Sequence, residues 1–166
     1  MTYNRFFLWG IISLLFQYFW YDNIGHMWAY TPHFILFVLL FFPEKHKGIL
    51  YLFTAFVSGL IIDALQFSGG IYTATSVTLA LILHYLYRIW QVQTNKNIDF
   101  IQLSSGKLTL VLLAASVLFE FLLYWFDSFS FSYVWQEKTS IFLQSISDSF
   151  FLLIFVLLLI RQPENA

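Results

Sequence analysis

The sequence predicts an all-α polytopic membrane protein with about six transmembrane helices. Of its 166 residues, 60% are hydrophobic and only 10% are charged, whereas an ordinary globular domain carries roughly 25% charged residues. The 8 basic and 9 acidic side chains are too few to cover the surface of a soluble domain of this length. A mean hydropathy of +0.74 agrees with this reading. We therefore expect a single integral membrane domain, covering residues 1–166, whose apolar surface faces lipid.

Six segments are candidates for membrane helices, since a spanning helix needs roughly 20 mainly apolar residues. The second segment is much shorter than this and begins at Pro32, a residue suited to the first turn of a helix. It is predicted either to extend backward or to be a partly buried helix that does not fully span. The longest polar stretch, 91–106, separates the fourth helix from the fifth. The predicted helices cover residues 5–21, 32–42, 49–66, 71–90, 107–126 and 140–160.

The basic residues predict the orientation, because cytoplasmic loops near helix ends are enriched in Lys and Arg. With six helices and a cytoplasmic N-terminus, only Lys138 among the 8 basic residues lies on the outer side. Removing or adding one helix would destroy this bias. We therefore expect both ends of the chain to be cytoplasmic. The basic residues on that side are Arg5, Lys45, Lys47, Arg88, Lys96, Lys107 and Arg161.

Composition and motifs exclude several classes of function. A net charge of -1 gives no basic surface for nucleic acid, and the absence of cysteine removes thiolate chemistry. The histidines His26, His33, His46 and His84 have no metal-ligand spacing, and His26 and His33 are expected to belong to an interfacial aromatic belt. No Ser-His-Asp order, glycine-rich phosphate loop or pair of carboxylates across a wet cleft is visible. The sequence therefore predicts no catalytic residue, no cofactor and no metal site.

Asp63 is the first of three ionisable residues predicted to lie inside the membrane, where a charged side chain costs about 2.5–3.5 kcal/mol on insertion scales. Ala55, Gly59 and Asp63 are spaced by four residues and therefore share one helical face. Small residues at this spacing let a second helix approach closely, and a polar group beside them can bond across the contact. Two readings remain: an internal packing face whose carboxylate caps or bonds a neighbouring loop, or a carboxylate that binds a partner or ligand.

Glu120 and Asp148 are the other two ionisable residues. Glu120 lies in the middle of the predicted helix 107–126, where an unpaired charge would cost more than neutralising it. We therefore expect it to be protonated or paired, with His84 as a candidate partner, and to serve either assembly or transport. Asp148 lies near the outer end of the predicted helix 140–160, so its side chain is expected to reach the outer interface.

A longer pattern occupies the middle of the chain. Pro32 opens a short apolar helix, Ala55-Phe56-x-x-Gly59-Leu60-x-x-Asp63 follows, and a glycine turn at Gly70 leads into Thr73-Ala74-Thr75. This order of residues resembles the rod shape-determining protein MreD family, in the form found in Bacteroidetes. The likeness is strongest over residues 32–90 and extends more weakly to the helices that contain Glu120 and Ser145.

The resemblance implies a protein of the bacterial inner membrane that belongs to the cell-elongation machinery and is not itself an enzyme. Members of the family work with the single-pass protein MreC, the actin-like MreB, the glycosyltransferase RodA and its partner transpeptidase. They help to position or activate peptidoglycan synthesis along the lateral wall. The resemblance also implies a fold similar to the substrate-binding subunits of energy-coupling-factor transporters. The residues expected to pack helices or bind a partner are Pro32, Ala55, Phe56, Gly59, Asp63, Gly70 and Glu120.

The alternative is that the chain is itself the substrate-binding membrane subunit of a vitamin transporter. Such a protein needs an outer pocket lined by polar and aromatic groups. It should also carry an Ala-x-x-x-Ala type of face on its first helix, where this chain offers only Gly10 and Ser13 among bulky residues. Candidate pocket residues in the outer half of the chain are Trp28, Tyr72, Asp127, Trp135 and Asp148.

Overall fold

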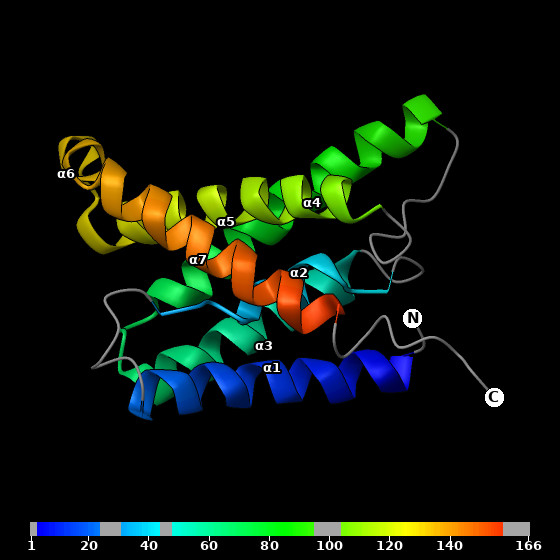
Figure 1. Cartoon of the computed structure of the whole chain (residues 1–166), viewed down its shortest axis with the longest axis horizontal. Coiled ribbons are helices and arrows are strands. Elements are labelled where there is room, and N and C mark those ends of the chain that lie inside the picture. Colours follow the sequence, from blue (N-terminus) through cyan, green and yellow to red (C-terminus); the bar gives the residue numbers. More distant parts are fainter. Residues whose placement is uncertain (1–2, 24–30, 44–47, 95–103, 158–166) are drawn as a thin grey trace.

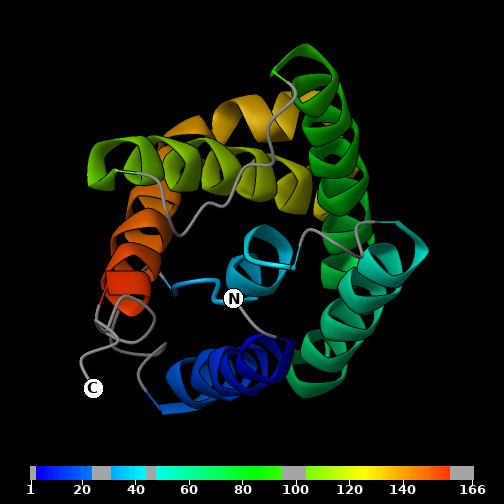
Figure 2. The same ribbon diagram turned by 90° about the vertical axis from the view of Figure 1, so that its right-hand side faces the viewer.

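The computed structural model describes residues 3–23, 31–43, 48–94 and 104–157, and over these residues it is all-helical. Five long helices form a ring around one short helix, α2 (Figures 1 and 2). The helices in chain order are α1 (Tyr3–Asn23), α2 (Ile35–Leu40), α3 (Ile49–Gln66), α4 (Ile71–Thr94), α5 (Ser105–Ser128), α6 (Phe131–Gln136) and α7 (Lys138–Phe155). The predicted all-α class is therefore confirmed.

The short helix α2 lies at the centre of the ring, and every one of its residues is buried. A short, buried helix is confirmed within the predicted range 32–42, but the predicted bounds are too wide, because the helix begins only at Ile35 and ends at Leu40. Side chains of α1 and α7 accept hydrogen bonds from backbone N–H groups just before and at the start of α2, which no preceding helical turn satisfies. The N–H of His33 donates to Asp148 Oδ1 at 2.8 Å, and the N–H of Ile35 donates to Gln17 Oε1 at 2.8 Å. The segment before α2 therefore needs no helical turn to satisfy its backbone.

Neighbouring helices around the ring are mostly neighbours in the chain, since α3 packs on α4, α4 on α5, and α5 on α7. Aromatic rings close the remaining gap between α1 and α7. The rings of Trp20 and Phe151 lie 4.8 Å apart in an edge-on arrangement, and those of Trp9 and Phe155 lie 6.1 Å apart. Aromatic side chains can bridge a wider separation between two helix backbones than small side chains can. Aromatic contacts therefore join α1 to α7 and complete the ring of helices.

The predicted helices 107–126 and 140–160 leave an aromatic-rich loop over residues 127–139, but this region contains the short helix α6. Phe129 takes a left-handed backbone conformation with φ of 48° and ends α5. Ser130 then caps α6, because its side-chain oxygen accepts a hydrogen bond from the N–H of Tyr133. Since α7 begins directly at Lys138, this region holds two connected helices in place of a loop.

Two helices, Ile49–Gln66 and Ser105–Ser128, are long and apolar enough to cross a membrane, with mean hydropathies of 1.8 and 2.1. Only 28% and 39% of their apolar windows are buried inside the protein. A core helix of a soluble protein would bury most of such a window, because exposing a contiguous apolar face to water is unfavourable. Composition and exposure together therefore indicate association with a membrane.

Candidate functional site

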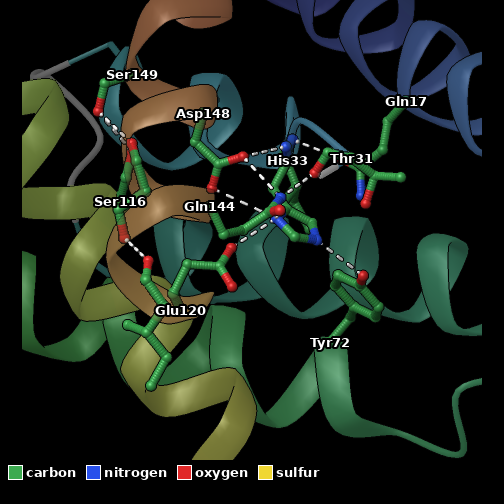
Figure 3. Close-up of polar contacts among 12 residues, drawn as sticks. Gln17, Thr31, His33, Tyr72, Ser116, Glu120, Gln144, Asp148 and Ser149 are labelled. Carbon is green, nitrogen blue, oxygen red and sulfur yellow. Dashed lines mark hydrogen bonds and ion pairs between the residues drawn. The ribbon is translucent and has the colours of Figure 1, made fainter. Parts of the chain in front are cut away.

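A cluster of polar side chains fills the interior of the ring beside α2. It is centred on His33, which precedes α2 and is buried. Glu120 reaches it from α5, Gln144 and Asp148 reach it from α7, and Tyr72 reaches it from the start of α4 (Figure 3). Four separate segments of the chain therefore meet at one imidazole ring.

Both ring nitrogens of His33 have polar neighbours. Nδ1 lies 2.7 Å from Glu120 Oε1 and 3.4 Å from Asp148 Oδ2. On the other side of the ring, Nε2 lies 3.0 Å from the hydroxyl of Tyr72. The Tyr72 contact fixes the orientation of the ring, so that Nδ1 faces the two carboxylates (Figure 3).

Glu120 is fully enclosed, with 1% of its side chain exposed. Its Oε1 atom is close enough to His33 Nδ1 for an ion pair when the imidazole is protonated. The contact nevertheless lacks the alignment of a hydrogen bond, and Oε1 accepts no hydrogen bond from any residue that the structure describes. Without a hydrogen bond to it, this buried oxygen depends on the ion pair with His33 alone to offset its desolvation.

Asp148 is held more firmly than Glu120. Its Oδ1 atom accepts the backbone N–H of His33 at 2.8 Å and the Gln144 amide at 3.4 Å. The same Gln144 amide also donates to the carbonyl of Thr31. Gln144 and Asp148 are four residues apart and therefore lie on one face of α7. This face of α7 positions the Asp148 carboxylate beside the His33 ring.

A pocket of about 400 Å³ leads to the cluster, and His33, Tyr72 and Glu120 are among its lining residues. Its wall is formed where α1, α3 and α5 end and where α4 begins, with a contribution from Gln144 on α7. Among the described residues, the lining includes the carboxylates of Glu120 and Asp127 but no Lys or Arg. The pocket is therefore suited to a polar or cationic occupant.

Several sequence-based predictions about these residues were wrong. His33 is buried against the carboxylates and does not belong to an interfacial belt, while His26 lies outside the described residues. Asp148 is 0% exposed and does not reach the outer interface. The histidine beside Glu120 is His33, and the Nδ1 atom of His84 has no hydrogen-bond partner among the described residues. The reason is the central position of α2, which brings the segment before it between α5 and α7.

Asp63 lies at a second polar junction, between the end of α3 and the start of α4. Its Oδ1 accepts the N–H of Tyr72 at 3.0 Å and the Ser68 hydroxyl. Its Oδ2 accepts the N–H of Thr73 at 2.8 Å and the Thr73 hydroxyl at 2.5 Å. The carboxylate therefore caps the first turn of α4, where free N–H groups and the helix dipole favour a negative charge. This contact corresponds to an internal packing face whose carboxylate bonds a neighbouring segment, which was the first of the two interpretations of Asp63.

Gly59 makes the same junction possible. A Cβ atom at this position would lie 2.6 Å from the Cα of Thr73, which is backbone and cannot move aside. Ala55 is buried on the same face of α3. The connecting turn uses Gly69 and Gly70, whose φ values of 67° and 98° favour glycine.

The remaining candidate residues occupy different environments. Pro32 is buried in the segment before α2, whereas Phe56 is exposed on the outward side of α3. Among the residues considered for an outer pocket, Tyr72 and Asp127 line it and Trp135 is exposed on α6. Trp28 lies outside the described residues. Two pocket residues, Tyr72 and Asp127, could thus be predicted from the sequence, whereas His33 and Gln144 were not predicted to line it.

Replacing Asp63 by alanine is expected to destabilise the protein by about 2 kcal/mol, because part-buried donors at the start of α4 would lose their acceptor. Asp63→Asn should lose less, since one oxygen remains. The matched control is Asp22→Ala, which removes an exposed carboxylate near the end of α1. Unfolding by SDS in dodecyl maltoside micelles, followed by tryptophan fluorescence, measures the difference. Equal stability of Asp63→Ala and Asp22→Ala would contradict the capping role.

No protein-family model, curated protein or solved structure matches this chain. The function must therefore be argued from the residues themselves and from the pattern that they form.

Proposed function

We propose that this chain is a non-catalytic, six-span scaffold of the bacterial inner membrane, of the MreD type. In this proposal, both ends are cytoplasmic. The helices α1, α3, α4, α5 and α7 cross the membrane, and the sixth span is the enclosed segment that contains the short helix α2. The scaffold docks an MreC-like single-pass protein. Together with MreB, a RodA-type glycosyltransferase and its transpeptidase, it helps to position or activate lateral peptidoglycan synthesis and so maintains cell shape.

The outward surface of the ring supports a multi-pass topology. Large apolar side chains are exposed on α1, α4 and α7 as well as on the two most apolar helices. The polar side chains of the cluster point inward. Lipid favours this arrangement, because intramembrane polar groups are stable when they face the interior of a bundle. Examples of exposed apolar residues are Leu8 and Leu15 on α1, Leu81 and Leu86 on α4, and Phe142 and Phe150 on α7.

The observation that carries the scaffold proposal is the junction between α3 and α4. The residues on which the resemblance depends, Gly59, Asp63 and Gly70, meet there and fix how α4 leaves α3. The sequence pattern therefore corresponds to one structural feature, the junction between α3 and α4. Its small-residue face is already covered by α4 of the same chain, so a partner helix must bind elsewhere.

The outward face of α3 is our candidate for that partner helix. Phe56 belongs to the resemblance pattern and is 44% exposed there, beside Phe53 and Leu60. In lipid, a second helix can gain van der Waals contact with such a face although no hydrophobic effect drives the association.

A photo-reactive phenylalanine analogue at position 56, introduced in the bacterium that carries the protein, tests this proposal. We expect a cross-link to a single-pass membrane protein with a coiled-coil ectodomain, identified by mass spectrometry. The matched control is position 150, a phenylalanine on α7 that is 57% exposed. We also expect rounding of the cells when the chain is depleted. Depleted cells that stay rod-shaped and incorporate wall precursors normally along their sides would overturn the scaffold proposal.

The pocket favours one alternative function, a substrate-binding subunit of a vitamin-type transporter. Its volume of about 400 Å³ lies within the range of small-molecule sites, about 300–1,000 Å³. Against this alternative, Gly10 and Ser13 are both buried inside the ring and leave no small-residue face on α1 for an energising subunit. Affinity purification separates the two functions: a transporter subunit should co-purify with a membrane-bound ATPase, and a scaffold with a single-pass protein.

A further inference from the structure

We propose that His33, Glu120 and Asp148 form a binding site for one divalent transition-metal ion, of which Zn²⁺ is the probe. Each residue offers one ligand atom, and the three atoms lie within 4.8 Å of one another. All three side chains are buried and come from different segments of the chain. This inference does not depend on the proposed scaffold role or on the pattern around Gly59.

The ligand set suits such an ion. One imidazole nitrogen and two carboxylate oxygens are common ligands of Zn²⁺ and of neighbouring first-row metals. Glu120 Oε1 has no hydrogen-bond partner among the described residues although it is enclosed and directed at His33 Nδ1. A bound cation would supply the partner that this oxygen lacks. Because metal–ligand distances are about 2.0–2.2 Å, the Nδ1–Oε1 separation should widen from its present 2.7 Å when an ion enters.

Charge balance favours the same conclusion. When both carboxylates are ionised and the imidazole is protonated, the buried cluster carries one net negative charge. No Lys or Arg in the part of the chain that the structure describes lines the adjoining pocket to compensate for this charge. A divalent cation with a neutral imidazole and two carboxylates brings the sum to zero, which lowers the desolvation penalty of buried charges.

The surroundings of the three ligands resemble the supporting contacts of metal sites. The hydroxyl of Tyr72, 3.0 Å from His33 Nε2, can hold the ring in the tautomer whose Nδ1 is free to bind metal. Gln144 and the His33 backbone N–H hold Asp148 through its Oδ1, which leaves Oδ2 facing the ring (Figure 3). The pocket beside Glu120 provides the entry path that a buried site needs.

The test is Zn²⁺ binding to the purified full-length protein in dodecyl maltoside, after treatment with a chelator. Isothermal titration and elemental analysis should give one Zn²⁺ per chain. We expect Glu120→Gln and His33→Ala to weaken binding by more than about 100-fold, and Tyr72→Phe to weaken it by about 10-fold, because supporting contacts are typically worth about 10- to 100-fold in affinity. The matched control is Asp127→Asn, a carboxylate that lines the same pocket outside the cluster. The Asp127→Asn protein should bind Zn²⁺ with the same affinity as the unmodified protein.

A second measurement keeps the inference testable if a cluster variant does not fold. X-ray absorption of the Zn²⁺-loaded unmodified protein should fit one imidazole, with oxygen atoms as the other ligands, at about 2.0–2.2 Å. A bound Zn²⁺ with no imidazole or with more than one would overturn the proposal. So would the absence of Zn²⁺ binding, or binding that a folded Glu120→Gln protein retains at full strength. Such results would leave the scaffold proposal untouched, because cross-linking at position 56 and cell shape are scored independently.

Discussion

Gly59→Ala is expected to destabilise the protein by about 3 kcal/mol, the upper part of the range for overpacking a tight contact. The added methyl group would meet the Thr73 Cα at 2.6 Å and the Tyr72 carbonyl oxygen at 2.9 Å. Both atoms belong to the backbone at the start of α4. Four hydrogen bonds to Asp63 hold this backbone and the turn before it in place. The two helices must therefore separate, and the cap on α4 weakens with them.

Gly10→Ala is the matched control for this substitution. Gly10 is also a buried glycine in a long helix, but a Cβ there meets only a side-chain methyl of Val38 at 3.7 Å, an ordinary contact. Alanine also favours the helical backbone by about 0.8–1.0 kcal/mol relative to glycine. We therefore expect this variant to be as stable as the unmodified protein or slightly more so. Unfolding by SDS in mixed micelles compares the two variants, and equal losses would contradict the close approach of α3 and α4.

The same contact changes the interpretation of a larger substitution. Gly59→Leu should prevent α3 from packing on α4 and abolish co-purification of a partner, but through loss of the fold. A surface substitution such as Phe56→Ala leaves the junction intact and is the informative one for partner binding. Normal co-purification of the partner with Gly59→Leu would argue against the close contact of α3 with α4 at this junction.

The sequence predicted the long helices of the ring well, because a long apolar segment and the residues that end it lie close together in the chain. Residues 49–66 were predicted as one helix, and α3 has these bounds, since Gly48 and the Gly69–Gly70 turn interrupt the apolar pattern on either side. The short helix α6 was missed because its aromatic residues have no helical periodicity and its signal is a single serine cap. The sequence left open whether the second helix extends backward or is partly buried, and α2 is short and enclosed on all sides.

The polar cluster could be predicted only in part. Glu120 was recognised as a buried charge that needs a partner, but the position of that partner depends on where α2 lies. His33 is 87 residues away in the chain from Glu120 and 115 away from Asp148, so no spacing rule connects them. One signal was present: Gln17, Gln144 and Asp148 interrupt otherwise apolar helices, and the last two share a face. Such residues mark the interior side of a membrane helix.

Phe37→Ala is expected to destabilise the protein by about 3–5 kcal/mol, the range for truncating an enclosed aromatic ring. Phe37 lies on α2, is 0% exposed, and its ring is 5.4 Å from that of Phe155 and 5.2 Å from that of Phe41. Because α2 is surrounded by the ring of helices, no neighbouring element can move inward freely to fill the space, and a cavity should remain. Phe53→Ala is the control, since this ring on α3 is 60% exposed and should leave stability unchanged in detergent. If α2 instead lay against lipid, the two truncations would have similar effects.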